Sequence, residues 1–589
     1  MDLFASFKQL RNEHPGLAAF RISAGDRSIP ISWRQFTDDI AATIRIIEKY
    51  GPGSTIGLLG ENSYEWMVSH AACLFGGATV VHVDPNIQPE EVARRLRFVG
   101  ARALIHSALY NEKAEAVERL SPGLAVGGFG TRLTDAFLDE ARTYIEKNKS
   151  GIFDRDNVAL DRARTSMIVF TSGTTSEPRG AELTLAGIET FCESTLRALP
   201  MRVGDRSLMM LPLHHIFGIC ATYAMLAAGV TLGVCPDFRR IQDVAQRFRI
   251  NFAFLVPALA EILAAKIERR GRNAEEVLGT RIEWIVTGGA PISRRAHERL
   301  QALGIRSLGA YGLTETTACY SMSRASEVFK PGSAGQISLA PGVEAKVSRE
   351  GELLIRGPNV MKGYYKMPEK TAQAIDRDGW FHTGDRGRID EDGFVWVAGR
   401  ASRTIVLNSG KKVAPEELEE KILGLPGVLE VVVSGEGESR QIVAEIYASI
   451  PEAQVQAAVA SLNRILPVYQ RISRVVLRAE PFQRTSSGKI CHAVRKAAPA
   501  VVESNRFPKF HAWLKFAWPI ALILGVLVRW LSDMVPEIIR LCGIRLSAGD
   551  QVVCAVCELI GDTLLALGAV LAIVFFKDIA VQIKKRLRF

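Results

Sequence analysis

The sequence is poor in cysteine, with nine among its 589 residues, and these nine are scattered along the chain. So few thiols, mostly in apolar surroundings, exclude a disulfide-stapled scaffold and indicate a reducing compartment. Internal repeats, low-complexity segments and an apolar run near the N-terminus are also lacking, and MDLFASFKQLRNEHPG carries charge from residue 2. We therefore expect neither a repeat architecture, nor an extensively disordered chain, nor a signal peptide.

Positive charge and apolar residues are both in excess, with a net charge of +10 and a mean hydropathy of +0.10. Much of this excess follows residue 500, where residues 501–589 hold eleven Lys/Arg against seven Asp/Glu. Two apolar stretches, 513–531 and 559–576, would be about 28 and 27 Å long as helices, close to the thickness of a bilayer core. We expect residues 505–589 to form a membrane-associated helical hairpin with a basic tail. A soluble hairpin is the alternative, because Asp562 interrupts the second stretch.

The basic residues on both flanks of the hairpin favour two cytoplasmic ends if the hairpin spans the bilayer, and an interfacial or re-entrant hairpin is the alternative to spanning. The catalytic part of the chain is then expected on the cytoplasmic side of the membrane. Because the basic excess lies largely beside apolar segments rather than among stacking aromatics, we expect no nucleic-acid partner.

Residues 1–500 have the pattern of an α/β protein. Ser32 and Gln35 form a capping pattern ahead of a helix with one apolar face. Short apolar strands alternate with helical segments, which predicts doubly wound, largely parallel sheets with ligands at the carboxyl ends of strands. Those strands are expected at 55–59, 79–83, 103–105, 167–170, 208–211, 252–256 and 282–286.

Three regions follow from this reading. Residues 1–400 are expected to form a large domain of doubly wound sheets, with glycine-punctuated β segments between 332 and 399 as a β subdomain. Residues 401–500 return to mixed helix and strand and are expected to form a small, mobile α+β lid domain. The apolar hairpin at 505–589 completes the chain.

The most informative loop is FTSGTTSEPRG, residues 170–180, which follows an apolar strand. Hydroxyl groups and a flexible glycine offer hydrogen-bond donors with little bulk, so the loop can wrap polyphosphate oxygens. A polar turn between a strand and a helix is the simpler alternative, and the spacing does not match a Walker loop. The candidate phosphate-binding residues are Thr171, Ser172, Gly173, Thr174 and Thr175.

This loop resembles the phosphate loop of the adenylate-forming acyl-CoA synthetase superfamily, whose usual form is TSGTTGxPKG. Two departures are visible, since Ser176 replaces a glycine and Arg179 replaces the lysine. Arg179 keeps the positive charge, so anion binding is expected to survive.

Further segments resemble the other motifs of that superfamily in the same order. MLPLHHIFG (210–218) implies that His215 lies at the mouth of an acyl pocket, and TGGAP (287–291) implies that Gly288 and Gly289 let adenine approach the backbone. AYGLTETT (310–317) carries three roles of its own. The resemblance implies that Tyr311 stacks on adenine, Thr314 meets the α-phosphate and Glu315 is the metal ligand for Mg²⁺.

The later motifs complete the resemblance, which covers about residues 30–495. GWFHTGD (379–385) implies that Asp385 accepts both ribose hydroxyls, and Arg400, at the hinge of the two domains, also reaches the ribose. After rotation of the small domain, Gly410 would approach the thiol donor. QRTSSGKI (483–490) places Lys489 as the catalytic lysine.

The hinge departs from the family pattern at two positions. Ser402 stands where an acid or a lysine is usual, and Arg403 follows where an acid is common. A hinge must absorb backbone rotation, which small residues tolerate, so the departures leave the energetics of switching open.

The resemblance implies an AMP-forming fatty acid–CoA ligase that uses ATP, Mg²⁺ and CoA. The segment LIRGPNVMKGYYKMPEKTAQAI (354–375) looks most like long-chain fatty acyl-CoA synthetases. Three alternatives remain: loading of acyl carrier protein in place of CoA, activation of an aromatic or short carboxylate, and a membrane-tethered pseudo-synthetase without activity.

Overall fold

In the computed structural model, residues Met1–Ala493 belong to one compact unit. The predicted membrane hairpin lies outside the described residues and stays a prediction, and no helix within those residues combines the length and apolar character needed to cross a bilayer. The residues that the structure describes are 1–24, 27–129, 151–155, 158–171, 179–269, 273–278, 280–290, 292–326, 330, 332–407, 411–436, 441–483 and 490.

A seven-stranded sheet has the order β18-β8-β7-β4-β3-β5-β6 and carries the phosphate-loop segment. The strands from β7 to β6 are parallel, whereas β8 and β18 are antiparallel additions at one edge. Alternate residues of β7 enter two cores, since Met167 and Val169 join one and Ile168 the other. The strands are β3 Thr55–Leu59, β4 Thr79–Val83, β5 Ala103–Ser107, β6 Ala125–Phe129, β7 Thr165–Thr171, β8 Arg179–Thr184 and β18 Gly363–Tyr364.

Two further sheets have the orders β2-β1-β10-β9 and β11-β12-β13-β14-β15. They meet where the Ser207 hydroxyl of β9 donates to the carbonyl of Phe252 in β11 at 2.9 Å. Strands β11, β12 and β13 are parallel, as expected from the apolar segments around 252 and 282. The bounds are β1 Ala18–Ala24, β2 Arg27–Ser32, β9 Arg206–Met209, β10 Thr231–Val234, β11 Phe252–Leu255, β12 Trp284–Thr287, β13 Arg306–Tyr311, β14 Ser321–Met322 and β15 Gln336–Ile337.

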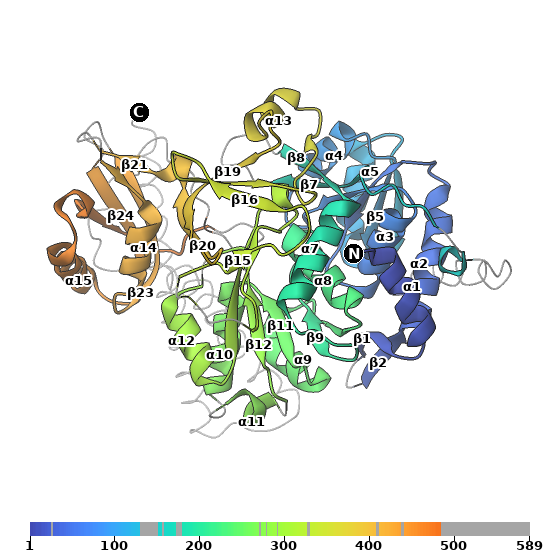
Figure 1. Cartoon of the computed structure of the whole chain (residues 1–589), viewed down its shortest axis with the longest axis horizontal. Helices are drawn as coiled ribbons and strands as arrows, with labels where there is room; N and C mark the ends of the chain where they lie inside the picture. The colour runs from blue at the N-terminus through green and yellow to red at the C-terminus, as the bar shows by residue number, and fades with distance from the viewer. Residues whose placement is uncertain are drawn as a thin grey trace, which may run out of the picture. The chain divides into compact units, whose positions relative to one another are not determined.

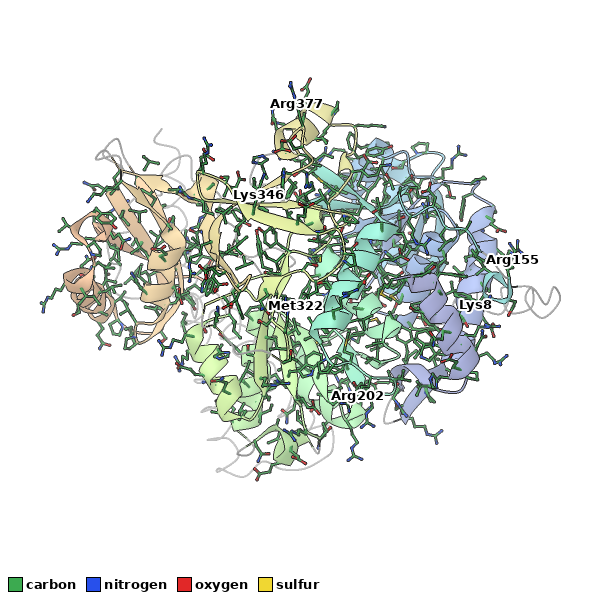
Figure 2. The ribbon with its side chains drawn as sticks, in the orientation of Figure 1. Lys8, Arg155, Arg202, Met322, Lys346 and Arg377 are labelled. Atoms are coloured by element: carbon green, nitrogen blue, oxygen red, sulfur yellow. The ribbon has the colours of Figure 1, made fainter. Side chains whose placement is uncertain are left out.

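Helices cover these sheets, and α7 and α8 lie side by side within the core shared by strands of the first two sheets (Figure 1). The predicted cap is confirmed, because Ser32 accepts from the amide of Gln35 at 3.2 Å where α2 begins. Lys8 of α1 donates to the carbonyl of Arg155 at 2.8 Å, and Figure 2 labels both residues. The helices are α1 Leu3–Glu13, α2 Trp33–Glu48, α3 Tyr64–Phe75, α4 Pro89–Phe98, α5 Asn111–Leu120, α7 Leu185–Ala198, α8 Ile216–Ala227, α9 Ile241–Phe248, α10 Pro257–Glu268, α11 Ala274–Leu278 and α12 Arg294–Ala302.

The glycine-punctuated region forms an antiparallel sheet of order β16-β17-β19-β20, so the β subdomain expected there is present. In its last pair of strands, Asp385 lies opposite Arg400. The elements are β16 Glu344–Val347, β17 Glu352–Arg356, α13 Pro368–Ala374, β19 Phe381–Ile389 and β20 Val395–Arg400.

The described residues from 405 to 477 have an apolar core of their own, built on Val413, Leu418, Ile446 and Val455. A two-stranded ribbon and a three-stranded sheet of order β23-β24-β25 surround it with two helices. The α/β class with a smaller α+β part is therefore confirmed. Its elements are β21 Ile405–Val406, β22 Lys412–Val413, α14 Pro415–Leu423, β23 Val428–Glu436, β24 Gln441–Ala448, α15 Glu452–Ile465 and β25 Arg474–Leu477.

Candidate active site

The phosphate-loop candidate connects the ends of β7 and β8. Thr171 closes β7, and its hydroxyl donates to the carbonyl of Arg179, which opens β8, at 3.4 Å. The loop residues between them, Ser172–Thr175 included, lie outside the described residues, and so do Gly410 and Lys489. The structure thus fixes the two ends of the loop at the carboxyl end of a central parallel strand, where ligands of such sheets bind.

Tyr364, to which the sequence motifs assign no role, contacts both Glu315 and Arg179. The hydroxyl of Tyr364 donates to Oε1 of Glu315 at 2.9 Å, and the Arg179 guanidinium lies 5.5 Å from the centroid of the Tyr364 ring. The second carboxylate oxygen of Glu315 accepts no hydrogen bond within the described part of the chain. A half-buried carboxylate with one oxygen held and one available suits a hard cation such as Mg²⁺, which also takes ligands from phosphates.

Thr314 and Glu315 belong to a short 3₁₀ turn, Thr314–Thr316, directly after β13. The Thr316 hydroxyl accepts from the amide of Leu313 at 2.9 Å and fixes the start of this turn. The carbonyl of Glu315 accepts from the amide of Met361 at 2.8 Å. Backbone contacts on both sides therefore hold the turn that presents Thr314 and Glu315.

Tyr311, Asp385 and Arg400 form one connected group. The Tyr311 hydroxyl donates to Oδ2 of Asp385 at 2.5 Å, and Nε of Arg400 lies 3.0 Å from Oδ1 of the same carboxylate. Burial raises the pKa of Tyr311, and the neighbouring Asp385 carboxylate raises it further. Asp385 is only 5% exposed, and a carboxylate accepts hydrogen bonds without competing donors, so it suits a pair of vicinal hydroxyls.

Gly288 and Gly289 follow β12, next to the strand that ends in Tyr311. A Cβ on Gly288 would lie 2.9 Å from the ring of Phe217, in the first turn of α8, so a larger residue would force that ring to shift. Gly289 is exposed and has a φ of +83°, and the nearest atom beyond its chain neighbours, in Val256, would lie 4.0 Å from an added Cβ. Its backbone is therefore open to close approach by a planar ring.

His215 lies in the segment that precedes α8, and its ring is 4.3 Å from that of His214. Burial lowers the pKa of His214 to about 4, while Asp84, with Oδ1 at 3.8 Å from Nε2, opposes the shift. Phe217 connects this segment to Gly288, so the expected acyl-mouth histidine and the expected adenine turn lie on neighbouring elements.

A buried chain of hydrogen bonds lies behind His215 and has no counterpart in the sequence motifs. The chain begins at Tyr223 of α8, whose hydroxyl oxygen lies 2.7 Å from Nδ1 of His70. The other nitrogen of that ring, Nε2, lies 3.0 Å from Nε2 of His82. Nδ1 of His82 lies 3.2 Å from the carbonyl oxygen of His214. Because a carbonyl only accepts, His82 must carry its hydrogen on Nδ1, and its Nε2 is then an acceptor. His70 therefore donates from Nε2. This leaves Nδ1 of His70 as the acceptor for the Tyr223 hydroxyl. The chain thus needs both imidazoles neutral, and burial lowers the pKa of His82 to about 4.

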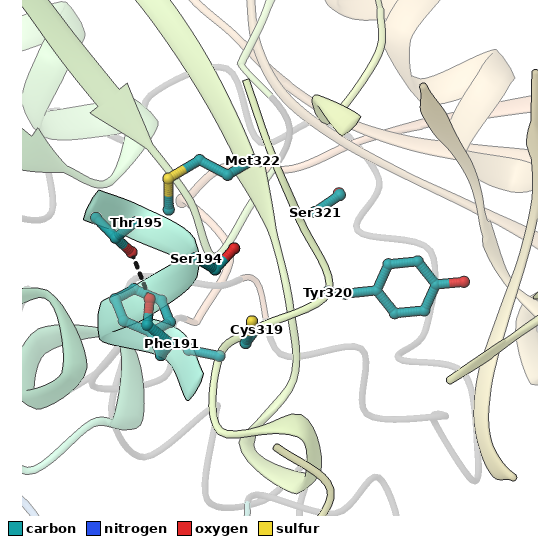
Figure 3. A pocket seen from close by; sticks show the side chains of 8 residues that line it. Phe191, Ser194, Thr195, Cys319, Tyr320, Ser321 and Met322 are labelled. Carbon is teal, nitrogen blue, oxygen red and sulfur yellow. Dashed lines mark hydrogen bonds between the residues drawn. The ribbon is translucent and has the colours of Figure 1, made fainter. Parts of the chain in front are cut away.

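Helix α7 packs against residues 318–322, the segment that follows the turn of Glu315. A cavity of only about 10 Å³ lies between α7 and the segment after that turn (Figure 3). This is room for about one water. The lining residues are Phe191, Ser194, Thr195, Ala318, Cys319, Tyr320, Ser321 and Met322.

The hinge arginine that departs from the family pattern is paired. Arg403 lies 2.9 Å from Oε1 of Glu416 and 2.6 Å from Oε1 of Glu419, both on α14. Glu419 also accepts from the amide of Val433 at 2.7 Å. Burial raises the pKa of Glu416, and the charge of Arg403 opposes that shift.

The structure links the described candidates in two groups, one around Glu315 and one around Asp385. Thr171, Glu315 and Tyr311 lie at or just after carboxyl ends of strands, and the Tyr364 bond joins the phosphate-loop segment to the turn of Glu315. Sequence reasoning missed Tyr364 although it quoted the GYY triplet, and it missed the chain of His70 and His82 entirely. A tyrosine near a glycine is a weak signal, and two separated histidines give none.

Comparison with known proteins identifies the family of the chain. The sequence model of the family described as AMP-binding enzyme matches residues 7–365, and that of the AMP-binding enzyme C-terminal domain matches residues 402–500. Feruloyl-CoA synthase from an Amycolatopsis species is 29% identical over 401 residues, which cover 66% of this chain and 77% of that protein. The long-chain-fatty-acid–CoA ligase FadD13 of Mycobacterium tuberculosis is 27% identical over 457 residues, covering 75% of this chain and 87% of that protein.

Among solved structures, ATP-bound MatB from Rhodopseudomonas palustris superimposes with a TM-score of 0.70. The match covers 83% of this chain and 97% of MatB at 24% identity, so it supports the fold alone.

Proposed function

The chain belongs to the family of AMP-binding enzymes, and from that premise we propose that it is an AMP-forming acid–CoA ligase. The observation that carries the proposal is that one short segment holds a member of each of two groups: Tyr311, at the end of β13, belongs to Tyr311–Asp385–Arg400, and Glu315, in the turn that follows, belongs to Arg179–Tyr364–Glu315. One group suits a metal-bound polyphosphate and the other a ribose, so together they suit a nucleoside triphosphate.

The reaction has two steps because a carboxylate has no good leaving group. In the first, a carboxylate oxygen attacks the α-phosphorus of ATP, the bond to the β-phosphate oxygen breaks, and pyrophosphate leaves. In the second, the thiol of CoA attacks the acyl carbon, the acyl–oxygen bond breaks, and AMP leaves with the bonding electrons while the thiol loses its proton. Alignment of the reactants and stabilisation of charge on the phosphates supply most of the rate.

Each described residue has a defined task in this scheme. Asp385 accepts the ribose hydroxyls, Tyr311 and the open backbone at Gly289 hold the adenine, and Thr314 donates to the α-phosphate. Glu315 would hold Mg²⁺, which when bound neutralises phosphate charge and orients the triphosphate.

The remaining assignments rest on the motifs. Thr171 and residues 172–175 would donate to the phosphates, with Arg400 reaching the ribose. Lys489 would neutralise charge in the first step, and Gly410 would approach the thiol in the second.

For the acyl group we propose a long-chain fatty acid, entering past His215. The similarity to FadD13 and the apolar C-terminal region support this choice. An aromatic acid is the second candidate, and the similarity to feruloyl-CoA synthase favours it.

We also propose that residues 505–589 attach the protein to a membrane with the catalytic part on the cytoplasmic side. The support is the sequence pattern of two apolar stretches with basic flanks. Deleting 505–589 should release the protein from sedimenting membranes and leave pyrophosphate release intact, whereas continued sedimentation of the truncated chain would contradict the assignment.

The decisive experiment is a panel of carboxylic acids offered to the purified protein with Mg-ATP. Pyrophosphate release should be fastest with palmitate or oleate, and acyl-CoA should form when CoA is added. Ferulate, 4-coumarate and short acids test the alternatives, and acyl carrier protein as a competing acceptor tests the other thiol. Absence of pyrophosphate release with every acid would favour the pseudo-synthetase and refute the proposal.

A further inference from the structure

Tyr364 joins two parts of the site that are far apart in the sequence. Its hydroxyl donates to Oε1 of Glu315 at 2.9 Å, and its ring lies under the guanidinium of Arg179, 5.5 Å from ring centroid to the carbon of that group. The side chain is buried, with an exposed fraction of 6%. One aromatic residue therefore contacts both the candidate metal ligand and the charged end of the phosphate loop.

The position of Tyr364 is fixed independently of these two contacts. Strand β18 pairs with β8, which places Tyr364 opposite Ala181, and the amide of Tyr364 donates to the hydroxyl of Thr371 at 2.9 Å. On either side, the amides of Lys362 and Tyr365 donate to carbonyls of β8 at 2.9 and 2.8 Å. The backbone of Tyr364 is thus held by strand pairing, and its side chain is buried, so the tyrosine can orient a neighbour rather than follow it.

We propose that Tyr364 is a positioning residue that sets the orientation of the Glu315 carboxylate toward the divalent cation of the bound nucleotide. This inference rests on the proposed function and adds a determinant of metal affinity to it. A free glutamate side chain rotates about its last torsion, and the Tyr364 bond holds Oε1, so Oε2 is presented in one orientation.

Arg179 contributes to the same arrangement through its shape. A guanidinium near an aromatic ring is attracted to it while its charge stays at the end of the phosphate loop, whereas the ammonium of a lysine is a compact point charge. The arginine at this position therefore fits the tyrosine beneath it, and the two residues together hold positive charge and the carboxylate in fixed relation.

The test compares Tyr364→Phe with Tyr365→Phe, a matched change one residue along the chain. The Tyr365 hydroxyl donates to the carbonyl of Val99 at 3.3 Å, so its loss removes a tyrosine hydrogen bond, here to a neutral acceptor, outside the site. Binding of Mn²⁺ to the protein–ATP complex is measured by electron paramagnetic resonance, and ATP binding in EDTA is measured by calorimetry. Tyr364→Phe should weaken Mn²⁺ binding about tenfold and change metal-free ATP binding less than twofold, with Tyr365→Phe like the wild type.

Arg179→Lys keeps the charge and removes the guanidinium from the Tyr364 ring, so we expect an intermediate, roughly threefold loss of Mn²⁺ affinity. Wild-type Mn²⁺ affinity in Tyr364→Phe, or equal losses with and without metal, would overturn the positioning role. If the wild-type protein itself binds no ATP in the presence of Mg²⁺, the proposed function fails, and that result is distinct from a failure of the variant alone.

Discussion

The buried chain from Tyr223 to His214 should make the fold sensitive to acid through His82. The folded-state pKa of His82 is lowered to about 4 from an ordinary 6.5, chiefly by burial. Between pH 4 and 6.5, His82 is therefore protonated in the unfolded chain and neutral in the folded chain. The stability contributed by the neutral imidazole is full above pH 6.5 and is lost as the pH falls from 6.5 towards 4.

The magnitude follows from the two pKa values. Between pH 7.5 and pH 5 the linkage relation gives a loss of roughly 2 kcal/mol of unfolding free energy for His82 alone. His214, lowered to about 4 as well, and His70, also lowered by burial, add to the total acid sensitivity. The single-site effect must therefore be isolated with a variant that keeps the hydrogen bonds.

His82→Gln meets that requirement. Its amide NH₂ can donate to the carbonyl of His214 and its oxygen can accept from Nε2–H of His70, so both contacts of the imidazole persist without a titrating group. Hydrogen–deuterium exchange of peptides from β4 and α8, at pH values corrected for intrinsic exchange, reports the local opening free energy. The variant should lose about 2 kcal/mol less than the wild type between pH 7.5 and 5.

A substitution outside the chain of hydrogen bonds, His14→Gln, is the control and should keep the wild-type acid response. If His82→Gln and the wild type lose stability in parallel down to pH 5, the buried imidazole is not the source of the acid sensitivity and the reasoning fails.

Three other changes test the site and the hinge. Lys489→Ala should reduce pyrophosphate release at least 100-fold, roughly 3 kcal/mol, while sparing thioester formation from supplied acyl-AMP, and equal loss of both steps would contradict its role. Asp385→Asn should raise the KM for ATP about tenfold, because a charged acceptor of Arg400 and of the ribose is lost, and an unchanged KM would contradict that assignment. Gly399→Ala should destabilise the protein by about 2 kcal/mol in thermal melting. Gly399 has a φ of +128°, and a Cβ there would overlap the carboxylate of Glu416. An unchanged melting temperature would show that the backbone around Gly399 relaxes to accept the methyl group.

Much of the fold could be predicted because local periodicity carries it. The helix over Trp33–Glu48 has its apolar face at three- and four-residue spacing and a serine cap, and both features act within a few residues. The parallel strands are short apolar runs, buried on both faces, and such runs stand out from the polar segments between them. Tyr311 and Asp385 could be named because their motifs are contiguous.

The contacts between those motifs could not be predicted in the same way. Tyr364 meets Glu315 only because β18 pairs antiparallel with β8, a strand far earlier in the chain, and nothing in either segment specifies that partner. His70 and His82 meet because a helix and a strand pack face to face, with Tyr223 supplied by a third element. Such contacts depend on tertiary packing, so a single sequence gives no signal for them.

Arg403 shows how a departure from a motif acquires its meaning only in three dimensions. In the sequence it replaces a common acid and leaves the energetics of the hinge open. In the structure, Arg403 pairs with Glu416 and Glu419 of α14. Oε2 of Glu416 is buried without a hydrogen-bond partner among the described residues, so the charge of Arg403 offsets the cost of burying that carboxylate. Because Arg403 is paired twice to α14, it must move with that helix. The Arg400 amide also donates to Oε1 of Glu416 at 3.4 Å, so the contacts to α14 begin next to Gly399, whose φ of +128° is a conformation that other residues rarely adopt.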